Sequence, residues 1–256
     1  MASRKYWSRD ELILAFNLYC KTPFGQIHNR NPNIIELARL INRTPSAVSW
    51  KLANYARLDP AIQARGLAGA SHGSKKEKEV WDEFHNDWES LSYESEKLEA
   101  TLRDRNLQDI IELDHIHLPQ EGLEHEAIVK VRVNQNFFRA TVLAAYHFEC
   151  CITGLSITSL LNASHIVPWS SDSKNRVNPR NGLCLNALHD RAFDRGLITL
   201  TEDYRVKISP TIIADKQAAI QDYLLKYDGV KIMLPDKFMP DQDLLSYHRT
   251  HIFQNP

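Results

Sequence analysis

Two stretches in the second half of the chain decide its fold. They are LLNASHIVPW at 160–169 and NGLCLNALHDRAFDRG at 181–196. The first predicts a strand that ends at Pro168, since proline has no N–H to donate to a strand ladder. The second predicts a short strand and then a helix, with Asn186 as its N-cap and Gly196 as its stop. The predicted order is therefore strand, loop, strand and helix.

The flanking segments complete an α+β pattern. Upstream, the apolar residues 140–146 predict a helix. Downstream, residues 197–201 and 204–208 alternate apolar and polar side chains around a two-residue turn, which is typical of a hairpin. We predict one α+β domain over residues 128–256.

Two histidines and an asparagine follow one another in an order that suits phosphodiester hydrolysis. His165 lies on the first strand, and a neutral imidazole can take a proton from water near pH 7. His189 lies on the helix, where one ring nitrogen can hold a divalent ion that polarises a phosphate. An asparagine side chain of the loop between them can fix that loop or an imidazole by hydrogen bonds. Three arginines are available to grip phosphate: Arg180, Arg191 and Arg195.

Over residues 130–210 the sequence resembles the HNH endonucleases, a family whose active site is a ββα-metal finger. The resemblance rests on three motifs in this order: ASHIVPW at 163–169, NPRNGL at 178–183 and LHDRAFDRGL at 188–197. It extends more loosely to residues 244–249. The chain is similar to the branch of HNH proteins associated with restriction.

The resemblance implies a DNA endonuclease that leaves 5′-phosphate and 3′-hydroxyl ends. His165 would be the general base, Asn181 the asparagine that orders the site, with Asn178 as the alternative, and His189 a ligand of a single ion. Asp194 would be a second ligand, a partner of a ligand, or the partner of an arginine. The implied ion is Mg²⁺, with Mn²⁺ or Ni²⁺ as alternatives.

Two departures from the family pattern bear on metal binding. Many HNH sites have an acidic residue or a histidine immediately before the base, where this chain has Ser164. The ion is then expected to have fewer protein ligands and to bind weakly. Many relatives also carry paired CxxC motifs for a structural zinc, which the four cysteines here do not form. We predict no zinc ribbon and expect Cys20 and Cys184 in the core.

The first 65 residues predict a three-helix domain. Ser8 and Glu11 have the spacing of a capping box, Asn33 starts a second cap pattern, and Thr44 precedes a proline at the start of a third helix. The tight turn before this third helix favours a helix-turn-helix. A small helical packing or protein-interaction module is the alternative.

Small polar and basic side chains of the third helix supply the predicted DNA contacts. Such side chains bind phosphates and base edges. The predicted contact residues are Ser46, Ser49, Lys51 and Asn54, and together with Trp50 they would lie largely off the core face of the helix.

The net charge of −1, from 31 basic and 32 acidic residues, hides an uneven distribution. Residues 1–65 carry 10 basic and 4 acidic side chains, residues 66–127 carry 6 and 16, and residues 128–200 carry 8 and 4. The local field decides whether a phosphate backbone is attracted, so the two basic blocks favour DNA as a partner.

Residues 66–127 are predicted to be a linker followed by an acidic amphipathic helix. Glycine, serine and lysine dominate residues 66–78, as in a flexible linker. Apolar side chains then recur every three or four residues over 81–102, which predicts a heptad seam. Two interpretations stay open, a homodimer through this seam or docking inside the same chain.

The sequence favours a cytoplasmic protein without membrane contact. No stretch approaches the roughly 20 apolar residues that span a bilayer, and the N-terminus has no signal-peptide core. The four cysteines do not form a disulfide framework.

Restriction or anti-phage defence is the setting that the resemblance implies, and three alternatives stay open. One is a DNA-binding regulator with a degenerate nuclease fold, for which Ser164 argues. Another is a defence-complex subunit that cuts only with partner proteins, and the third is an RNA-directed nuclease. One HNH site cuts one strand, so double-strand cleavage would need a dimer or two encounters.

Overall fold

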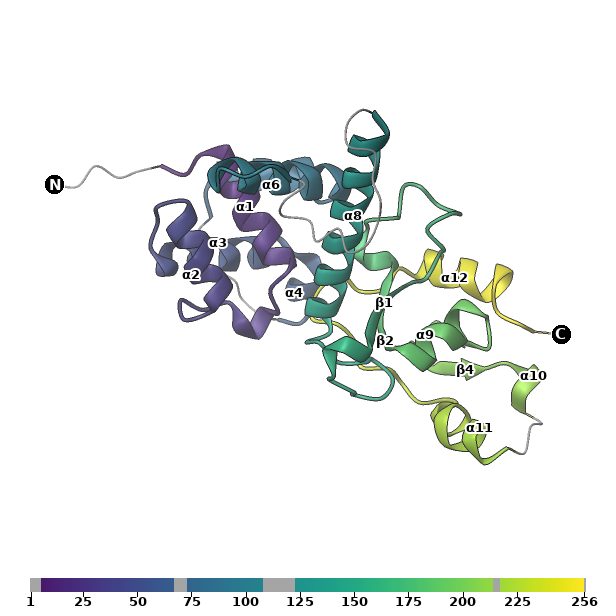
Figure 1. Cartoon of the computed structure of the whole chain (residues 1–256). Helices are drawn as coiled ribbons and strands as arrows, with labels where there is room; N and C mark the ends of the chain where they lie inside the picture. Colours follow the sequence, from purple (N-terminus) through teal and green to yellow (C-terminus); the bar gives the residue numbers. More distant parts are fainter. Residues whose placement is uncertain (1–5, 67–72, 108–122, 214–216, 256) are drawn as a thin grey trace. The chain divides into compact units, whose positions relative to one another are not determined.

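The chain divides into two compact units, Met1–Phe137 and Phe138–Pro256. The computed structural model describes residues 6–66, 73–107, 123–213 and 217–255 (Figure 1). Across these ranges no helix is both long and apolar enough to cross a membrane.

The first unit is helical. Its elements are α1 (Arg9–Cys20), η1 (Phe24–Gln26), α2 (Pro32–Leu40), α3 (Pro45–Leu58), α4 (Pro60–Ala64), α5 (Lys75–Phe84), α6 (Trp88–Leu102) and part of α8 (Leu123–Ala145). The predicted capping box of Ser8 and Glu11 is present on α1, and Thr44 caps α3, so both predictions are confirmed. The second helix differs: its N-cap is Asn31 rather than Asn33, because a proline follows at the first helical position.

An aromatic cluster joins α1, α3 and α5. The ring centroid of Phe16 lies 4.7 Å from that of Tyr55 and 5.0 Å from that of Trp81. The Tyr55 hydroxyl donates a hydrogen bond to the carbonyl oxygen of Leu12 at 3.0 Å. Burial raises the pKa of Tyr55, so this hydroxyl stays a donor. The core of the unit therefore extends from the three predicted helices into the acidic segment that follows them.

The predicted seam over 81–102 packs inside its own chain. Trp81, Phe84 and Trp88 are buried, and both α5 and α6 contact α1. The stripe is also not one helix, because α5 ends before Asp87, which caps α6. Of the two interpretations, internal docking is the one observed. The buried side chains Trp81, Phe84 and Trp88 are therefore not available to a second copy of the chain, whereas Leu102 at the end of the seam is exposed.

The acidic segment belongs to the first unit instead of forming a separate connector, because its carboxylates pair with the basic residues before it. These ion pairs are Arg9 with Glu83 and Glu94, Lys21 with Glu96, and Lys51 with Glu77. Much of the charge on residues 1–65 is therefore neutralised within the unit. Residues 67–72 of the predicted linker lie outside the described residues.

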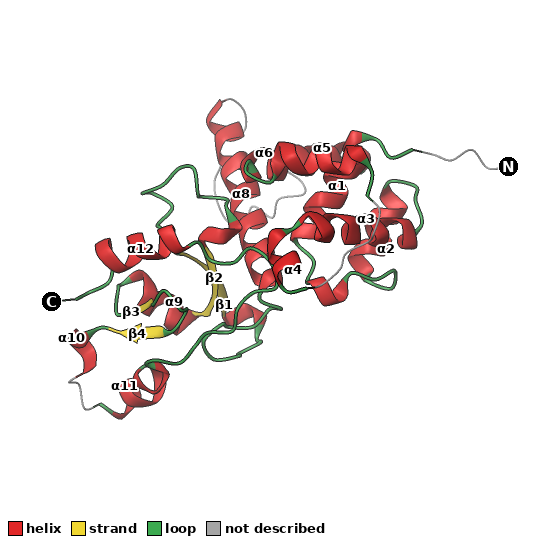
Figure 2. Ribbon diagram, turned by 180° about the vertical axis from the view of Figure 1, so that it is seen from behind, coloured by secondary structure: helices red, strands yellow, loops and turns green. Residues whose placement is uncertain are grey.

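The second unit has small sheets and short helices (Figure 2). Its elements are the end of α8, η2 (Thr158–Leu160), β1 (Leu161–His165), η3 (Pro179–Asn181), β2 (Gly182–Asn186), α9 (Ala187–Asp194), β3 (Ile198–Leu200), β4 (Val206–Ile208), α10 (Pro210–Ile213), α11 (Ala218–Tyr223), η4 (Leu225–Tyr227) and α12 (Gln242–His251). β1 pairs with β2 and β3 with β4, both antiparallel. The helix predicted at 140–146 is the end of the much longer α8.

The first predicted strand is shorter than expected. β1 ends at His165, and beyond it the backbone N–H of Val167 bonds to the side chain of Asn181 at 2.8 Å. A side chain thus replaces the partner strand at this point, so the ladder stops before Pro168.

The predicted helix after the second strand is confirmed. Asn186 caps α9 by accepting from the backbone N–H of His189 at 2.9 Å. Gly196 follows the helix with a φ of 67°, and a Cβ there would lie 2.0 Å from the carbonyl oxygen of Ile252. Only glycine fits this left-handed, closely packed position.

Candidate active site

A two-stranded ladder and one helix position the candidate site. β1 and β2 pair from Leu161 opposite Asn186 to His165 opposite Gly182, and α9 packs on both strands. Gly182 lets α8 approach, because a Cβ there would lie 2.3 Å from Cγ2 of Val142. The ring of His165 consequently stacks on Phe138 of α8, with centroids 3.9 Å apart.

The imidazole of His165 is held in one tautomer. Its Nε2 lies 2.9 Å from the carbonyl oxygen of Arg176. Because a carbonyl oxygen only accepts, Nε2 carries the hydrogen and Nδ1 carries the lone pair. The Trp169 ring packs edge-on against the His165 ring, with the two centroids 5.7 Å apart, and further restricts its orientation. Among the described residues Nδ1 has no hydrogen-bond partner, so it is the nitrogen able to accept a proton.

The surroundings keep His165 neutral. Burial lowers its pKa, while the Arg176 carbonyl and the charge of Asp190 act in the opposite direction and offset only part of this effect. At pH 7 the ring is therefore unprotonated, which is the state that a general base requires.

Asn181 fixes the loop that follows His165 and does not touch the imidazole. Its Oδ1 accepts from Val167 N at 2.8 Å, and its Nδ2 donates to the carbonyl oxygens of Val167 and Asn175, both at 3.1 Å. The side chain is fully buried. Asn178, the alternative, caps the turn η3 by accepting from Arg180 N at 3.0 Å. Of the two, Asn181 orders the longer part of the loop.

His189 does not fit the metal-ligand role that the resemblance implies. Its Nδ1 accepts from the side-chain amide of Asn186 at 2.8 Å, and its Nε2 donates to the carbonyl oxygen of Tyr223 at 2.9 Å. The ring is buried and meets Tyr227 edge-on at 5.2 Å. Both ring nitrogens are therefore occupied, so in this structure neither offers a lone pair to an ion. The ring instead ties α9 to α11.

Asp190 is a candidate that the sequence analysis missed. It follows His189 on α9 and is only partly buried. Asn162 of β1 donates to its Oδ2 at 2.7 Å. Its negative charge raises the pKa of both His165 and Asp194. The i,i+4 spacing from Asp194 could have identified it, because residues so spaced share a helix face.

The carboxylates of Asp190 and Asp194 on α9 suit a hard cation that takes few protein ligands. Burial and the nearby charge of Asp190 raise the pKa of Asp194, which shows that the two carboxylates repel one another. Mg²⁺ is commonly held by one or two carboxylates together with water and substrate phosphate. Within the described ranges no three His, Cys, Asp or Glu side chains form a metal-binding group. Asp190 and Asp194 thus offer two carboxylates four residues apart on α9, which is the number that Mg²⁺ commonly takes from a protein.

The three predicted phosphate-binding arginines differ in their surroundings. Arg191 and Arg195 are exposed on and just after α9, and their charges lower the pKa of Asp194 against the larger effect of burial. Arg180 pairs with Asp241 at 2.9 Å and is half-exposed. Arg191 and Arg195 are therefore better placed to meet a phosphate beside the carboxylate pair.

The predicted DNA contacts on α3 are only partly on an open face. Ser46 is exposed, and the Ser49 hydroxyl donates back to the carbonyl oxygen of Ser46 at 3.1 Å. Lys51 and Asn54 both bind the carboxylate of Glu77 on α5. The expectation that Asn54 lies off the core face is wrong, because packing of α5 on α3 buries it.

Residues 150–201 match the HNH endonuclease family. The matched range contains β1, β2 and α9 with His165, Asn181 and His189. This range is therefore an HNH endonuclease domain, and such a domain implies a phosphodiester hydrolase that acts on nucleic acid. The match does not include the helices of the first unit. No curated protein matches the chain.

Proposed function

From the HNH endonuclease domain at residues 150–201, we propose that the chain is a divalent-metal-dependent DNA endonuclease. The observation that carries the proposal is the state of His165. Its Nε2–H is fixed on the Arg176 carbonyl, its Nδ1 is free, and burial keeps the ring neutral. A general base needs these three properties together.

In the proposed reaction, Nδ1 of His165 takes a proton from a water molecule as that water attacks the phosphorus. The new P–O bond forms while the bond to the 3′ oxygen breaks, which leaves a 5′-phosphate and a 3′-hydroxyl once that oxygen gains a proton. The carbonyl of Arg176 keeps the ring oriented, and its hydrogen bond from Nε2–H stabilises the imidazolium that forms.

Asp190 and Asp194 are the proposed metal ligands, in place of His189. When bound, a divalent ion supplies charge stabilisation at the phosphate and the leaving oxygen. Arg191 and Arg195 would hold the neighbouring phosphates by paired N–H contacts. Asn181 acts as a positioning residue, because its bonds hold the loop that carries the Arg176 carbonyl.

DNA is the proposed substrate, and the first unit is the proposed reader. Support comes from the exposed side chains of α3, Ser46 and Trp50. Restriction or anti-phage defence in the cytoplasm is the proposed setting.

The test is plasmid cleavage by the full chain in Mg²⁺, Mn²⁺ or Ni²⁺, with RNA in parallel. We expect nicked or linear DNA from the wild type and a loss of about 10²–10⁴-fold in rate for His165→Ala. His251→Ala is the matched control, since that histidine is exposed and lies on α12 outside the site. Cleavage that survives in His165→Ala, or cleavage of RNA alone, would overturn the proposal.

A further inference from the structure

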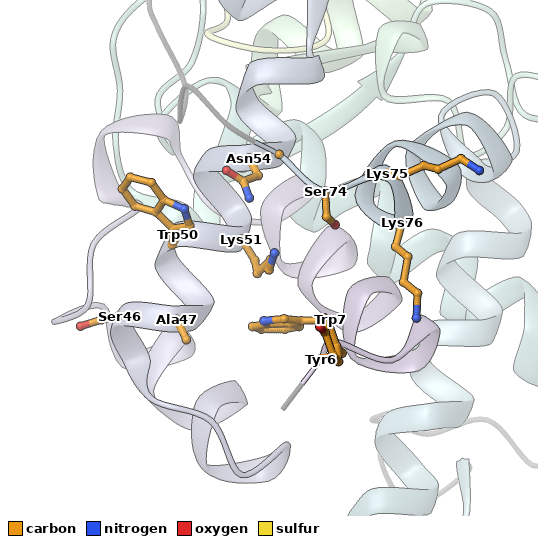
Figure 3. Close-up of a pocket in the computed structure, with 11 residues that line it drawn as sticks. Tyr6, Trp7, Ser46, Ala47, Trp50, Lys51, Asn54, Ser74, Lys75 and Lys76 are labelled. Atoms are coloured by element: carbon orange, nitrogen blue, oxygen red, sulfur yellow. The ribbon is translucent and has the colours of Figure 1, made fainter. Parts of the chain in front are cut away.

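A cavity of about 890 Å³ lies in the first unit between α3 and the start of α5 (Figure 3). Pockets that hold small ligands have volumes of about 300–1,000 Å³. Its lining combines three aromatic and three basic side chains: Tyr6, Trp7, Trp50, Lys51, Lys75 and Lys76. Aromatic faces beside cations are the composition of a nucleotide-binding surface.

Two of the aromatic rings are exposed to solvent. Trp50 is 58% exposed on α3, and Tyr6 is 80% exposed. The third ring, that of Trp7, already makes two cation–π contacts. The Arg43 guanidinium lies 4.8 Å and the Lys51 ammonium 5.4 Å from its centroid. Because Val48, Leu52 and Tyr55 of the same helix are buried, the exposed Trp50 is available for stacking against a planar ligand.

The opposite wall is suited to a phosphate. Lys75 and Lys76 occupy the first turn of α5, a helix of ten residues whose N-cap is Ser74. Backbone N–H groups and the helix dipole at such an end attract anions. The Glu77 carboxylate already accepts from Ser74 N at 2.9 Å and Lys75 pairs with Glu79 at 3.5 Å, so Lys76 and the other N–H groups of this turn are what an anion would meet. Both lysines are exposed, and Figure 3 shows Lys76 extending along the side of the cavity where Tyr6 and Trp7 lie.

A buried acceptor at the cavity wall lacks a partner. Asn54 is only 2% exposed, and its Nδ2 donates to Glu77 at 2.9 Å. Its Oδ1 is buried and makes no hydrogen bond with any described residue. An unpaired buried oxygen is unfavourable, so a ligand that brings an N–H group would be stabilised there. The exocyclic amino groups of adenine, cytosine and guanine are such donors.

Lys51 and Asn54 also cannot act as a protruding reading head. Glu77 binds both of them at the junction of α3 and α5, and the side chain of Lys51 is only 13% exposed. Both line the cavity, so a base that leaves the stack would meet them there.

We propose that this cavity binds a DNA nucleotide whose base is unstacked from the double helix. The base stacks on Trp50, its amino group donates to Oδ1 of Asn54, and its phosphate lies at Lys76 and the first turn of α5. Single-stranded DNA and a base flipped out of a duplex offer the same chemistry. The inference rests on the proposed function in that the ligand is DNA.

The test is fluorescence anisotropy with the full chain in EDTA, so that no metal-dependent cleavage occurs. The probes are labelled single strands of dC or dT, a perfect duplex, and a duplex with one unpaired cytosine. We expect the dC strand and the unpaired duplex to bind at least 10-fold more tightly than the perfect duplex, and dC more tightly than dT. Comparing the dC strand with the duplex that has one unpaired cytosine distinguishes binding of a single strand from binding of a flipped base.

Two variants with matched controls locate the binding. Trp50→Ala should weaken binding to the dC strand about 10-fold or more, and Lys76→Glu should weaken it and reduce its salt dependence. Ile35→Ala and Lys97→Glu change an exposed apolar residue and an exposed lysine elsewhere in the unit, and should stay within 2-fold of wild type. Circular dichroism checks that all four fold.

Three results would overturn the inference. They are equal affinity for the perfect duplex, no effect of Trp50→Ala on binding, or equal affinity for an RNA strand. The outcome is independent of catalysis, because His165→Ala should bind the probes as the wild type does. A chain that binds but never cuts refutes only the nuclease proposal, and a chain that cuts but binds the duplex best refutes only this one.

Discussion

His165 and His189 lie in the same HNH segment, yet their ring nitrogens are in different states. His165 has one nitrogen bonded to a carbonyl and one free, whereas His189 has Asn186 on one nitrogen and the Tyr223 carbonyl on the other. A ring with a free lone pair can exchange a proton, and a ring with both nitrogens bonded holds structure together. The hydrogen bonds around an imidazole, and not the residue type, distinguish the two roles.

The largest expected effect on cleavage is that of replacing Asp190, the carboxylate next to His189 in the sequence. If Asp190 takes the ligand role, Asp190→Asn should lower the rate on the order of 100-fold and raise the Mg²⁺ concentration needed for half-maximal rate. Cleavage measured against Mg²⁺ concentration checks this. Asp243→Asn, an exposed carboxylate at the start of α12, is the control. An unchanged metal requirement in Asp190→Asn would return the ligand role to other residues.

A smaller effect is expected from His189→Ala, and it should appear in stability and not in cleavage. His189→Ala removes the partner of Asn186 and leaves the Tyr223 carbonyl without its donor. The free energy of unfolding should fall by about 1–3 kcal/mol. Urea unfolding measures the loss, while cleavage well below the melting temperature should stay within 10-fold of wild type. If His189→Ala folds but cuts as slowly as His165→Ala, His189 has more than a structural role.

The smallest effect is the pH dependence. Burial lowers the pKa of His165 below its ordinary value of 6.5, so the free base persists when the pH falls from 7.5 to 6.5. The cleavage rate at pH 6.5 should therefore exceed half of the rate at pH 7.5. A pH–rate profile with its acidic midpoint at or above 6.5 would contradict a buried neutral base.

Much of the second unit could be predicted from local chemistry. The cap at Asn186 and the stop at Gly196 depend on neighbouring residues, so the sequence shows them directly. The bonds of Asn181 to Val167 and Asn175 could not be predicted, since they depend on how the loop between the strands returns.

The first unit shows why spacing alone is insufficient. Heptad spacing over 81–102 indicates which side chains are buried but not what covers them, and the cover is α1 of the same chain. Glu77 meets Lys51 and Asn54 across more than 20 residues of sequence, so no local pattern marks them as held. Asp190 is hard to single out for another reason, because the family motif draws attention to its neighbour His189.

In the proposed reaction, the imidazole at position 165 supplies the base through its free nitrogen. Cleavage by His165→Gly, measured with and without added imidazole, tests this most directly. We expect a rate about 10²–10⁴-fold below wild type that rises as imidazole is added. His189→Gly should show no such rescue. A His165→Gly protein that cuts DNA as fast as the wild type would contradict the claim.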